Sequence, residues 1–252
     1  MGEQKLGMLV DVEKCIGCNA CTIACKAENK IPEGAFATEI KQGWKGKFPN
    51  VVNFYSKIAC MHCSDPACVK VCPVGALYQT PEGIVVQDQD KCVGCQYCVN
   101  SCPFGIPQYN RAVDKSFKCT MCMHRVSQGM EPACVATCPT GALQFGNRAE
   151  LRAKAEQRVK DLKGRFPLAN VYQPEEVGGT GLIYVLTDTP ANFGLVEHPK
   201  VSATVEVWQD YVQPYAAWLI PLALLGSATS FLSSRLLTNK NEHGDHEERG
   251  DK

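Results

Sequence analysis

Sixteen cysteines are the residues of this 252-residue chain whose type and spacing could do the most chemistry. All of them lie between Cys15 and Cys138, and they fall into four groups of four with none left over. In chain order the groups are Cys15, Cys18, Cys21 and Cys25; Cys60, Cys63, Cys68 and Cys72; Cys92, Cys95, Cys98 and Cys102; and Cys119, Cys122, Cys134 and Cys138. Thiolates bind zinc and iron–sulfur clusters, so the groups predict metal binding.

The spacing within the groups favours iron–sulfur clusters over zinc or disulfides. The first and third groups have the spacing C-x2-C-x2-C-x3-C, and a proline directly follows the last cysteine of the second, third and fourth groups. In bacterial ferredoxins with this spacing, three thiolates hold one [4Fe–4S] cluster and the fourth ligates the neighbouring cluster. Disulfides between such close cysteines are strained, and zinc sites usually join two separated pairs. We therefore expect sixteen iron ligands and four [4Fe–4S] clusters, with a structural zinc protein as an alternative.

The four groups also form an internal repeat. Residues 65–77 and 131–143 match at nine of 13 positions, and residues 14–25 and 91–102 match at six of 12. Groups one and two therefore repeat as groups three and four. A duplication of this kind predicts a two-fold-like unit with equivalent metal sites.

Charge and the remaining polar residues narrow the function. The chain has 26 basic and 26 acidic residues, so its net charge gives no reason to expect a nucleic-acid partner. Lys14, Lys91 and Lys118 directly precede the first cysteine of three groups. They either offset cluster charge or are ordinary solvated lysines.

Because each quartet of cysteines is complete, His62 and His124 are expected to have packing roles. No catalytic motif is evident, so we expect no enzyme activity in this chain.

The sequence pattern around the cysteines predicts an α+β fold. The expected domain is a tandem bacterial-ferredoxin-like domain with duplicated pairs of clusters. Short helices are expected at the last two cysteines of each group. Strands are expected at Leu9–Asp11, Leu143–Phe145 and Leu182–Thr187, with a hairpin formed by Leu77–Gln79 and Ile84–Gln87. Asn147 is expected to cap a charged helix over 148–163, and Gly178–Gly181 to form a turn and not a phosphate loop. The expected domains are 1–146, an extension at 147–210, a span at 211–237 and a polar tail at 238–252.

The C-terminal region predicts one transmembrane helix. Residues 215–237 contain a single charge, Arg235, and aromatic residues gather at the start of the stretch. A buried core helix is the alternative. Arg235 and Lys240 flank its C-terminal end, which predicts a cytoplasmic C-terminus and a cluster domain on the extracytoplasmic, periplasmic face. No export signal is evident at the N-terminus, so export is expected to depend on a partner.

With these motifs, the chain resembles the four-cluster iron–sulfur subunits of the molybdopterin oxidoreductase superfamily. Residues 171–214, followed by the apolar stretch, look most like the beta subunit of membrane-bound formate dehydrogenase. The resemblance implies an electron-transfer subunit that works between a molybdopterin catalytic subunit and a membrane cytochrome b in the lipid bilayer. Equivalent subunits of a membrane hydrogenase or of a polysulfide or tetrathionate reductase stay open, as does a free ferredoxin-like carrier.

The resemblance also implies how the ligands are shared. In the family, groups one and four exchange their last cysteines, as do groups two and three. The implied ligand quartets are Cys15, Cys18, Cys21 and Cys138; Cys119, Cys122, Cys134 and Cys25; Cys92, Cys95, Cys98 and Cys72; and Cys60, Cys63, Cys68 and Cys102.

Overall fold

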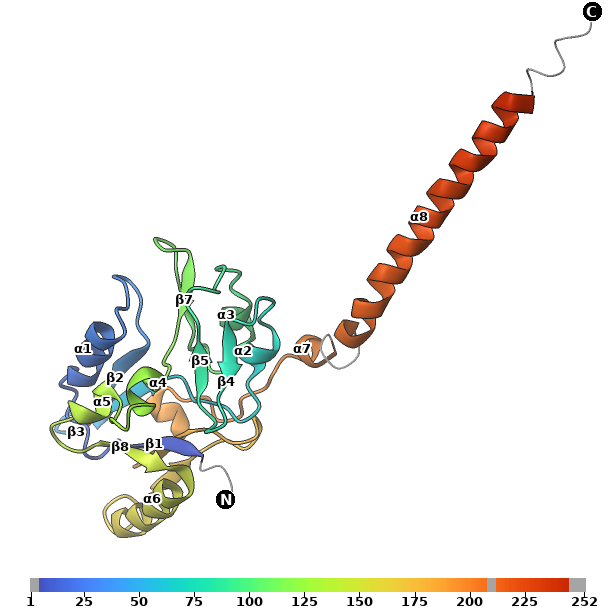
Figure 1. Ribbon diagram of the computed structural model, residues 1–252. Coiled ribbons are helices and arrows are strands. Elements are labelled where there is room, and N and C mark those ends of the chain that lie inside the picture. The colour runs from blue at the N-terminus through green and yellow to red at the C-terminus, as the bar shows by residue number, and fades with distance from the viewer. Residues whose placement is uncertain (1–4, 208–211, 245–252) are drawn as a thin grey trace, which may run out of the picture. The chain divides into compact units, whose positions relative to one another are not determined.

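The computed structural model describes residues 5–207 and 212–244, which divide into one unit up to Val205 and a second from Glu206. The first unit contains a four-stranded sheet with strand order β8-β1-β10-β9 (Figure 1). Its strands are β1 (Leu6–Asp11), β8 (Leu143–Asn147), β9 (Asn170–Tyr172) and β10 (Leu182–Leu186). β1 pairs antiparallel with β8 and parallel with β10, and every residue of β10 is buried. The expected strands at β1, β8 and β10 are confirmed, and the sheet unites the N-terminus with residues beyond the cysteine groups.

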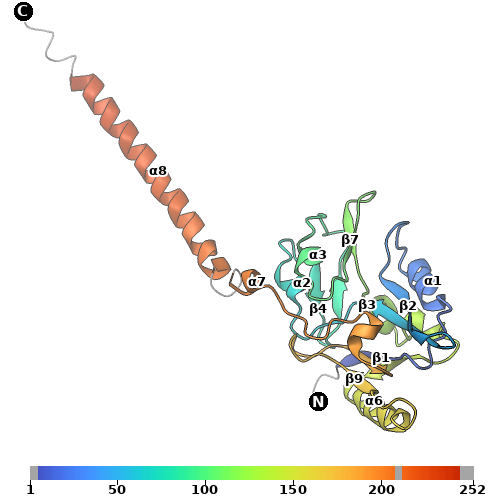
Figure 2. The ribbon, with the colours of Figure 1, turned by 180° about the vertical axis from the view of Figure 1, so that it is seen from behind.

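Helix α6 (Arg148–Leu162) covers one face of this sheet, as Figures 1 and 2 show. The expected cap is present, because the Asn147 side chain accepts hydrogen bonds from the backbone N–H of Ala149 and Glu150 at 2.9 and 3.4 Å. The buried residues of α6 repeat at helical spacing and pack on the apolar face of β1 and β10; they are Leu151, Ala155, Val159 and Leu162.

Three two-stranded hairpins complete the strands of the first unit. They are β2 (Thr38–Lys47) with β3 (Asn50–Ala59), β4 (Leu77–Gln79) with β5 (Val85–Gln87), and β6 (Gln108–Asn110) with β7 (Lys115–Phe117). The expected hairpin at β4 and β5 is confirmed, with the Thr80–Ile84 turn between its strands. The β2–β3 hairpin has no counterpart among the sequence-based expectations.

Short helices lie at the last two cysteines of each group, as expected. They are α1 (Ala20–Glu28), α2 (Ala67–Lys70), α3 (Tyr97–Ser101) and α5 (Ala133–Ala136). A further helix, α4 (Met123–Val126), directly follows Cys122 and was not expected. Asn19 and Gln96, which precede α1 and α3, both adopt the left-handed conformation with φ of 60° and 63°. The repeat seen in the sequence is therefore repeated in backbone conformation. Helix α1 packs against α5, and α2 packs against α3, so group one meets group four and group two meets group three.

The last part of the chain forms the 3-10 helix η1 (Pro190–Phe193), α7 (Ala203–Val207) and α8 (Gln213–Gly244). Among the helices that the structure describes, none is both long and apolar enough to cross a membrane. The predicted transmembrane helix at 211–237 is therefore not confirmed, and Pro221 and several hydroxyl side chains interrupt the apolar surface of α8. Residues 208–211 of the aromatic entrance and 245–252 of the tail lie outside the described residues.

Candidate iron–sulfur centres

The sixteen thiols are all free, and their mutual electrostatic influence groups them into four sets. We name these set A (Cys15, Cys18, Cys21, Cys138), set B (Cys25, Cys119, Cys122, Cys134), set C (Cys60, Cys63, Cys68, Cys102) and set D (Cys72, Cys92, Cys95, Cys98). Each set takes three cysteines from one sequence group and one from another. The membership is the same as in the exchange that the family resemblance implies, and ligation of iron by these thiols stays a prediction.

Set A lies where the loop before α1 meets the end of α5. Burial raises the pKa of the Cys15 thiol, and the other thiols of the set raise it further. All four thiols line one cavity, whose wall is mainly apolar and includes Val10 and Leu143. A cavity lined by four thiols has the donor chemistry of a [4Fe–4S] site.

Set B is the most enclosed of the four, since all its cysteines are buried. Burial raises the pKa of the Cys25 thiol to about 12, and the Cys134 and Cys122 thiols add to this rise, although the Lys57 ammonium opposes it. For Cys119, burial again raises the pKa, with Cys25 as the thiol that contributes most. Metal ligands must be deprotonated, and buried thiols with raised pKa values, such as Cys25 and Cys119, ionise only when a nearby cation compensates their charge.

Sets C and D lie in the part of the first unit that contains helices α2 and α3. Burial raises the pKa of the Cys68 thiol to about 12, and its neighbours Cys60 and Cys102 contribute. In set D, burial raises the pKa of Cys98, although a hydrogen bond from Ser116 opposes it. Residues of both sets therefore fit iron–sulfur ligation by the same argument as set B. In residues 5–207 and 212–244, no group of three or more Cys, His, Asp or Glu side chains forms a ready site for a single metal ion.

Neighbouring sets influence one another through specific pairs of thiols. Cys134 of set B raises the pKa of Cys21 in set A, after the larger effect of burial. In the same way, Cys60 of set C raises the pKa of Cys119 in set B, and Cys98 of set D raises the pKa of Cys68 in set C. Burial is again the largest cause of both shifts. These pairs connect set A with set B, set B with set C, and set C with set D. The exposed Cys18 and Cys95 belong to the two end sets.

Two buried lysines lie near the thiols, Lys57 at sets A and B and Lys118 at sets B and C. Of the three lysines singled out in the sequence, Lys118 is 4% exposed, whereas Lys91 is exposed and forms an ion pair with Asp88. The Lys118 ammonium donates hydrogen bonds to the carbonyl oxygens of Val85 and Cys119 at 2.6 and 3.0 Å. Lys57 is 1% exposed and was not predicted from the sequence. Its signal is a lysine inside the run Phe54–Ala59, three residues before Cys60.

The two histidines near the cysteines take part in hydrogen bonds away from the sets. His62 is fully buried, and its Nδ1 accepts a hydrogen bond from the Val85 N–H at 3.0 Å. Burial, together with the charges of Lys118 and Lys57, holds its pKa well below the ordinary value, so the ring is neutral. His124 lies 2.9 Å from Glu28. These positions agree with the packing roles expected from the sequence.

Comparison with known proteins places this geometry in a family. A model described as a 4Fe-4S dicluster domain matches residues 51–148, and one described as a 4Fe-4S binding domain matches residues 12–28. The formate dehydrogenase iron–sulfur subunit of Haemophilus influenzae is 38% identical over 97% of this chain and 84% of its own length. The nitrate-inducible formate dehydrogenase iron–sulfur subunit of Escherichia coli is 42% identical over 84% of this chain and 80% of its own length. The chain belongs to this family of iron–sulfur subunits.

As an iron–sulfur subunit, the chain transfers electrons and is not itself catalytic. A subunit of the anaerobic dimethyl sulfoxide reductase of Escherichia coli is 44% identical, but over only 59% of this chain and 76% of its own length. The chain is therefore similar to this reductase subunit over part of its length, and to formate dehydrogenase subunits over most of its length.

Proposed function

We propose that sets A, B, C and D each hold one [4Fe–4S] cluster. A cluster of this kind supplies one-electron transfer when bound. The observation that carries the proposal is that sixteen free thiols from distant parts of the chain gather into four sets of four. The buried thiols of set B keep water away from its centre, and the apolar wall of set A does the same.

We further infer that electrons follow the order A, B, C, D. What supports this order is that Cys134 acts on the pKa of Cys21, Cys60 on that of Cys119, and Cys98 on that of Cys68, in each case after the larger effect of burial. The end sets, with the exposed Cys18 and Cys95, are the places where partners can approach. Electrons then enter at one end set and leave at the other.

We infer the electron-transfer partners of this chain from the complexes to which its relatives belong. We propose a molybdopterin catalytic subunit of the formate dehydrogenase type as electron donor, because the formate dehydrogenase subunits match over most of the chain. The proposed acceptor is a membrane cytochrome b. A dimethyl sulfoxide reductase-type partner is the second candidate, favoured by the 44% identity over 156 residues. A free carrier would have no large partner.

One purification tests the cluster number and the partner together. The native complex is isolated anaerobically through a tag on this chain, its large subunit is identified by mass spectrometry, and iron and acid-labile sulfide are counted. We expect a molybdenum- or tungsten-containing formate dehydrogenase subunit, with about 16 iron and 16 sulfide per chain. About 12 irons or fewer, or zinc without sulfide, contradicts the four-cluster proposal. A reductase-type large subunit selects the second candidate.

We also propose that α8 attaches the chain to a membrane partner, with the cluster domain on the extracytoplasmic face. Helix α8 exposes large apolar side chains, among them Leu219, Leu222 and Leu225, which favour an apolar environment. Arg235 and Lys240 at its far end favour the cytoplasmic side. Protease added to sealed spheroplasts is expected to digest the cluster domain and spare a C-terminal tag. Protection of the cluster domain reverses this topology.

A further inference from the structure

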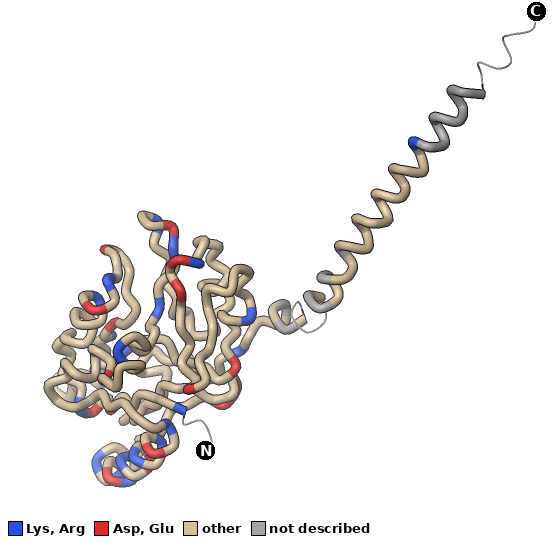
Figure 3. The backbone as a smooth tube through the Cα atoms, viewed as in Figure 1, with Lys and Arg blue, Asp and Glu red and all other residues tan. Residues whose placement is uncertain are grey.

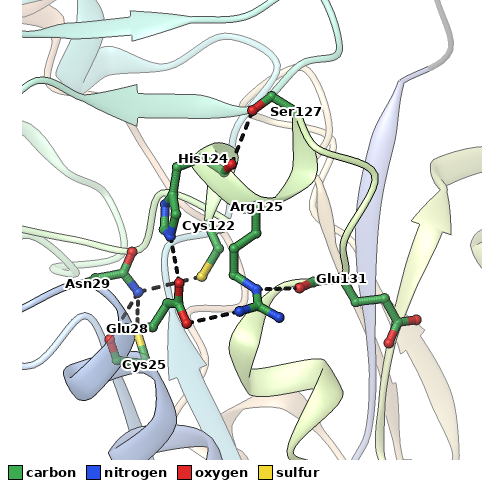
Figure 4. Close-up of polar contacts among 8 residues, drawn as sticks. All are labelled: Cys25, Glu28, Asn29, Cys122, His124, Arg125, Ser127 and Glu131. Atoms are coloured by element: carbon green, nitrogen blue, oxygen red, sulfur yellow. Dashed lines mark hydrogen bonds and ion pairs between the residues drawn. The ribbon is translucent and has the colours of Figure 1, made fainter.

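An asparagine amide lies against two sulfurs of set B (Figure 4). Asn29 directly follows the last turn of α1, and its Nδ2 donates a hydrogen bond to the carbonyl oxygen of Cys25 at 2.9 Å. The same nitrogen lies 3.6 Å from the Cys25 sulfur and 3.5 Å from the Cys122 sulfur. Cys25 belongs to the first sequence group and Cys122 to the fourth. One amide therefore donates to sulfurs that the chain brings from opposite ends of the cysteine region.

The residue before Asn29 fixes this arrangement. The Glu28 carboxylate contacts His124 Nε2 at 2.9 Å and accepts a hydrogen bond from Arg125 Nη1 at 3.0 Å. Arg125 also donates from Nε to the carbonyl oxygen of Glu131 at 2.9 Å. Figure 4 shows these contacts joining the end of α1 to α4, which begins directly after Cys122. The contacts hold the Asn29 amide at its two sulfurs.

A buried ammonium group acts on the same set from β3. Lys57 donates a hydrogen bond to Thr38 Oγ1 at 2.7 Å and is 1% exposed. Burial disfavours its charge, but the nearby Cys134 and Cys119 thiols outweigh burial and raise the pKa of the Lys57 ammonium. Both of these thiols belong to set B, but Lys57 also acts on Cys21 of set A and lines the cavity of that set. A fixed positive charge therefore lies in a water-excluded position that sets A and B share.

The contacts that other sets receive are different in kind. In set D, Ser116 Oγ lies 3.4 Å from the Cys98 sulfur, and Gln87 Nε2 lies 3.8 Å from the Cys92 sulfur. In set A, the exposed Thr140 hydroxyl lies 3.8 Å from the Cys138 sulfur. Set C has the buried Lys118 ammonium near Cys68, and set A shares Lys57. What distinguishes set B is an amide nitrogen within 3.6 Å of two of its sulfurs, in addition to the shared Lys57 ammonium.

We propose that Asn29 and Lys57 raise the reduction potential of the cluster in set B. The inference rests on the proposed function, because it requires a [4Fe–4S] cluster there. Reduction adds one negative charge to a buried centre, and both an N–H directed at its ligand sulfurs and a fixed ammonium stabilise that charge. Set B is second in the proposed order, so its potential controls passage from the first set to the last two.

The test uses the full complex and two variants, Asn29→Leu and Lys57→Met, which remove the donor and the charge with small changes in volume. Electrochemical titration followed by EPR gives the potential of each cluster, and the signal of set B is identified by its loss in Cys122→Ser. Asn29→Leu is expected to shift that signal alone to more negative potential, whereas Lys57→Met is expected to shift it together with the signal of set A, whose cavity Lys57 lines. We expect the equilibrium constant for reduction to fall about tenfold, which is about 59 mV for one electron.

The matched control is Lys91→Met, which removes an exposed lysine that directly precedes Cys92. We expect no shift of any cluster, because water already screens this charge. Four clusters in the wild-type complex, with the set B potential unshifted in either variant, overturn the inference and leave the proposed function standing. Fewer than four clusters in the wild type overturn the proposed function itself.

A second measurement covers the case in which a variant loses iron instead of shifting its potential. The wild-type complex is labelled with asparagine carrying ¹⁵N in the side-chain amide and is examined by pulsed EPR. We expect a nitrogen coupling in the signal of set B, since the Asn29 amide contacts two of its sulfurs. A set B signal without this coupling contradicts the inference.

Discussion

At the residue scale, each proposed cluster site depends on one cysteine that comes from a different sequence group than the other three. Cys138 follows α5 and completes set A, while Cys25 lies in α1 and completes set B. The packing of α1 against α5 brings these residues together. The two buried lysines also differ in whether the sequence or the fold brings them to the thiols. Lys118 adjoins Cys119 in sequence and was one of three lysines for which a role in offsetting cluster charge was considered, whereas Lys57 reaches set B only through the fold of β3.

The exchange of last cysteines predicts a selective effect of Cys138→Ser. We expect this variant to impair the cluster of set A more than that of set B, although Cys138 belongs to the fourth sequence group. The reason is that Cys138 influences Cys15 and Cys21, which are both in set A. EPR of the reduced complex measures the loss of each signal. The matched variant Cys25→Ser is expected to impair set B, and a reversed pattern would show that the exchange is wrong.

At the scale of elements, the sequence predicted a helix or hairpin correctly where that element has its own cap, turn or periodic buried face. Helix α6 has Asn147 at its N-terminus and a buried stripe at helical spacing, and the β4–β5 hairpin has its Thr80–Ile84 turn. The β2–β3 hairpin was missed because its far half is exposed and gives no alternation of buried and exposed residues. That hairpin nevertheless carries Lys57 and Thr38.

The cap of α6 predicts a local loss of stability in Asn147→Ala. The variant removes the acceptor for the N–H groups of Ala149 and Glu150, and such a change costs about 1 kcal/mol. We expect faster hydrogen exchange in the first turn of α6 and a lower unfolding temperature of the complex. Lys154→Ala, an exposed change within the same helix, serves as control and should change neither. Equal exchange in the two variants contradicts a capping role.

At the scale of the whole molecule, the cysteines are part of the core as well as of the sites. Four of them, Cys21, Cys60, Cys119 and Cys134, pack in the main buried cluster with residues of β1 and β10. Sets A and B tie residues near the N-terminus to residues more than a hundred positions later in the chain. Bound metal would therefore close long loops and contribute to folding.

Removal of iron is expected to unfold much of the first unit. Anaerobic chelation should decrease far-ultraviolet circular dichroism, because buried thiols of the core lose the charge compensation that holds them together. Addition of ferrous iron and sulfide should restore the signal. An iron-free chain that keeps its full helical and strand signal would show that the sheet and α6 fold without metal.

The sequence by itself determined the local chemistry: four cysteine groups, their ferredoxin spacing, the duplication, and the capped helix after them. These features are readable because spacing, capping and periodicity act between residues close in the chain. Only the tertiary structure decided the parallel pairing of β1 with β10, the place of Lys57 beside set B and the contact of Asn29 with Cys122. Each of these joins segments far apart in sequence, and packing of the buried faces, which no local pattern encodes, brings them together.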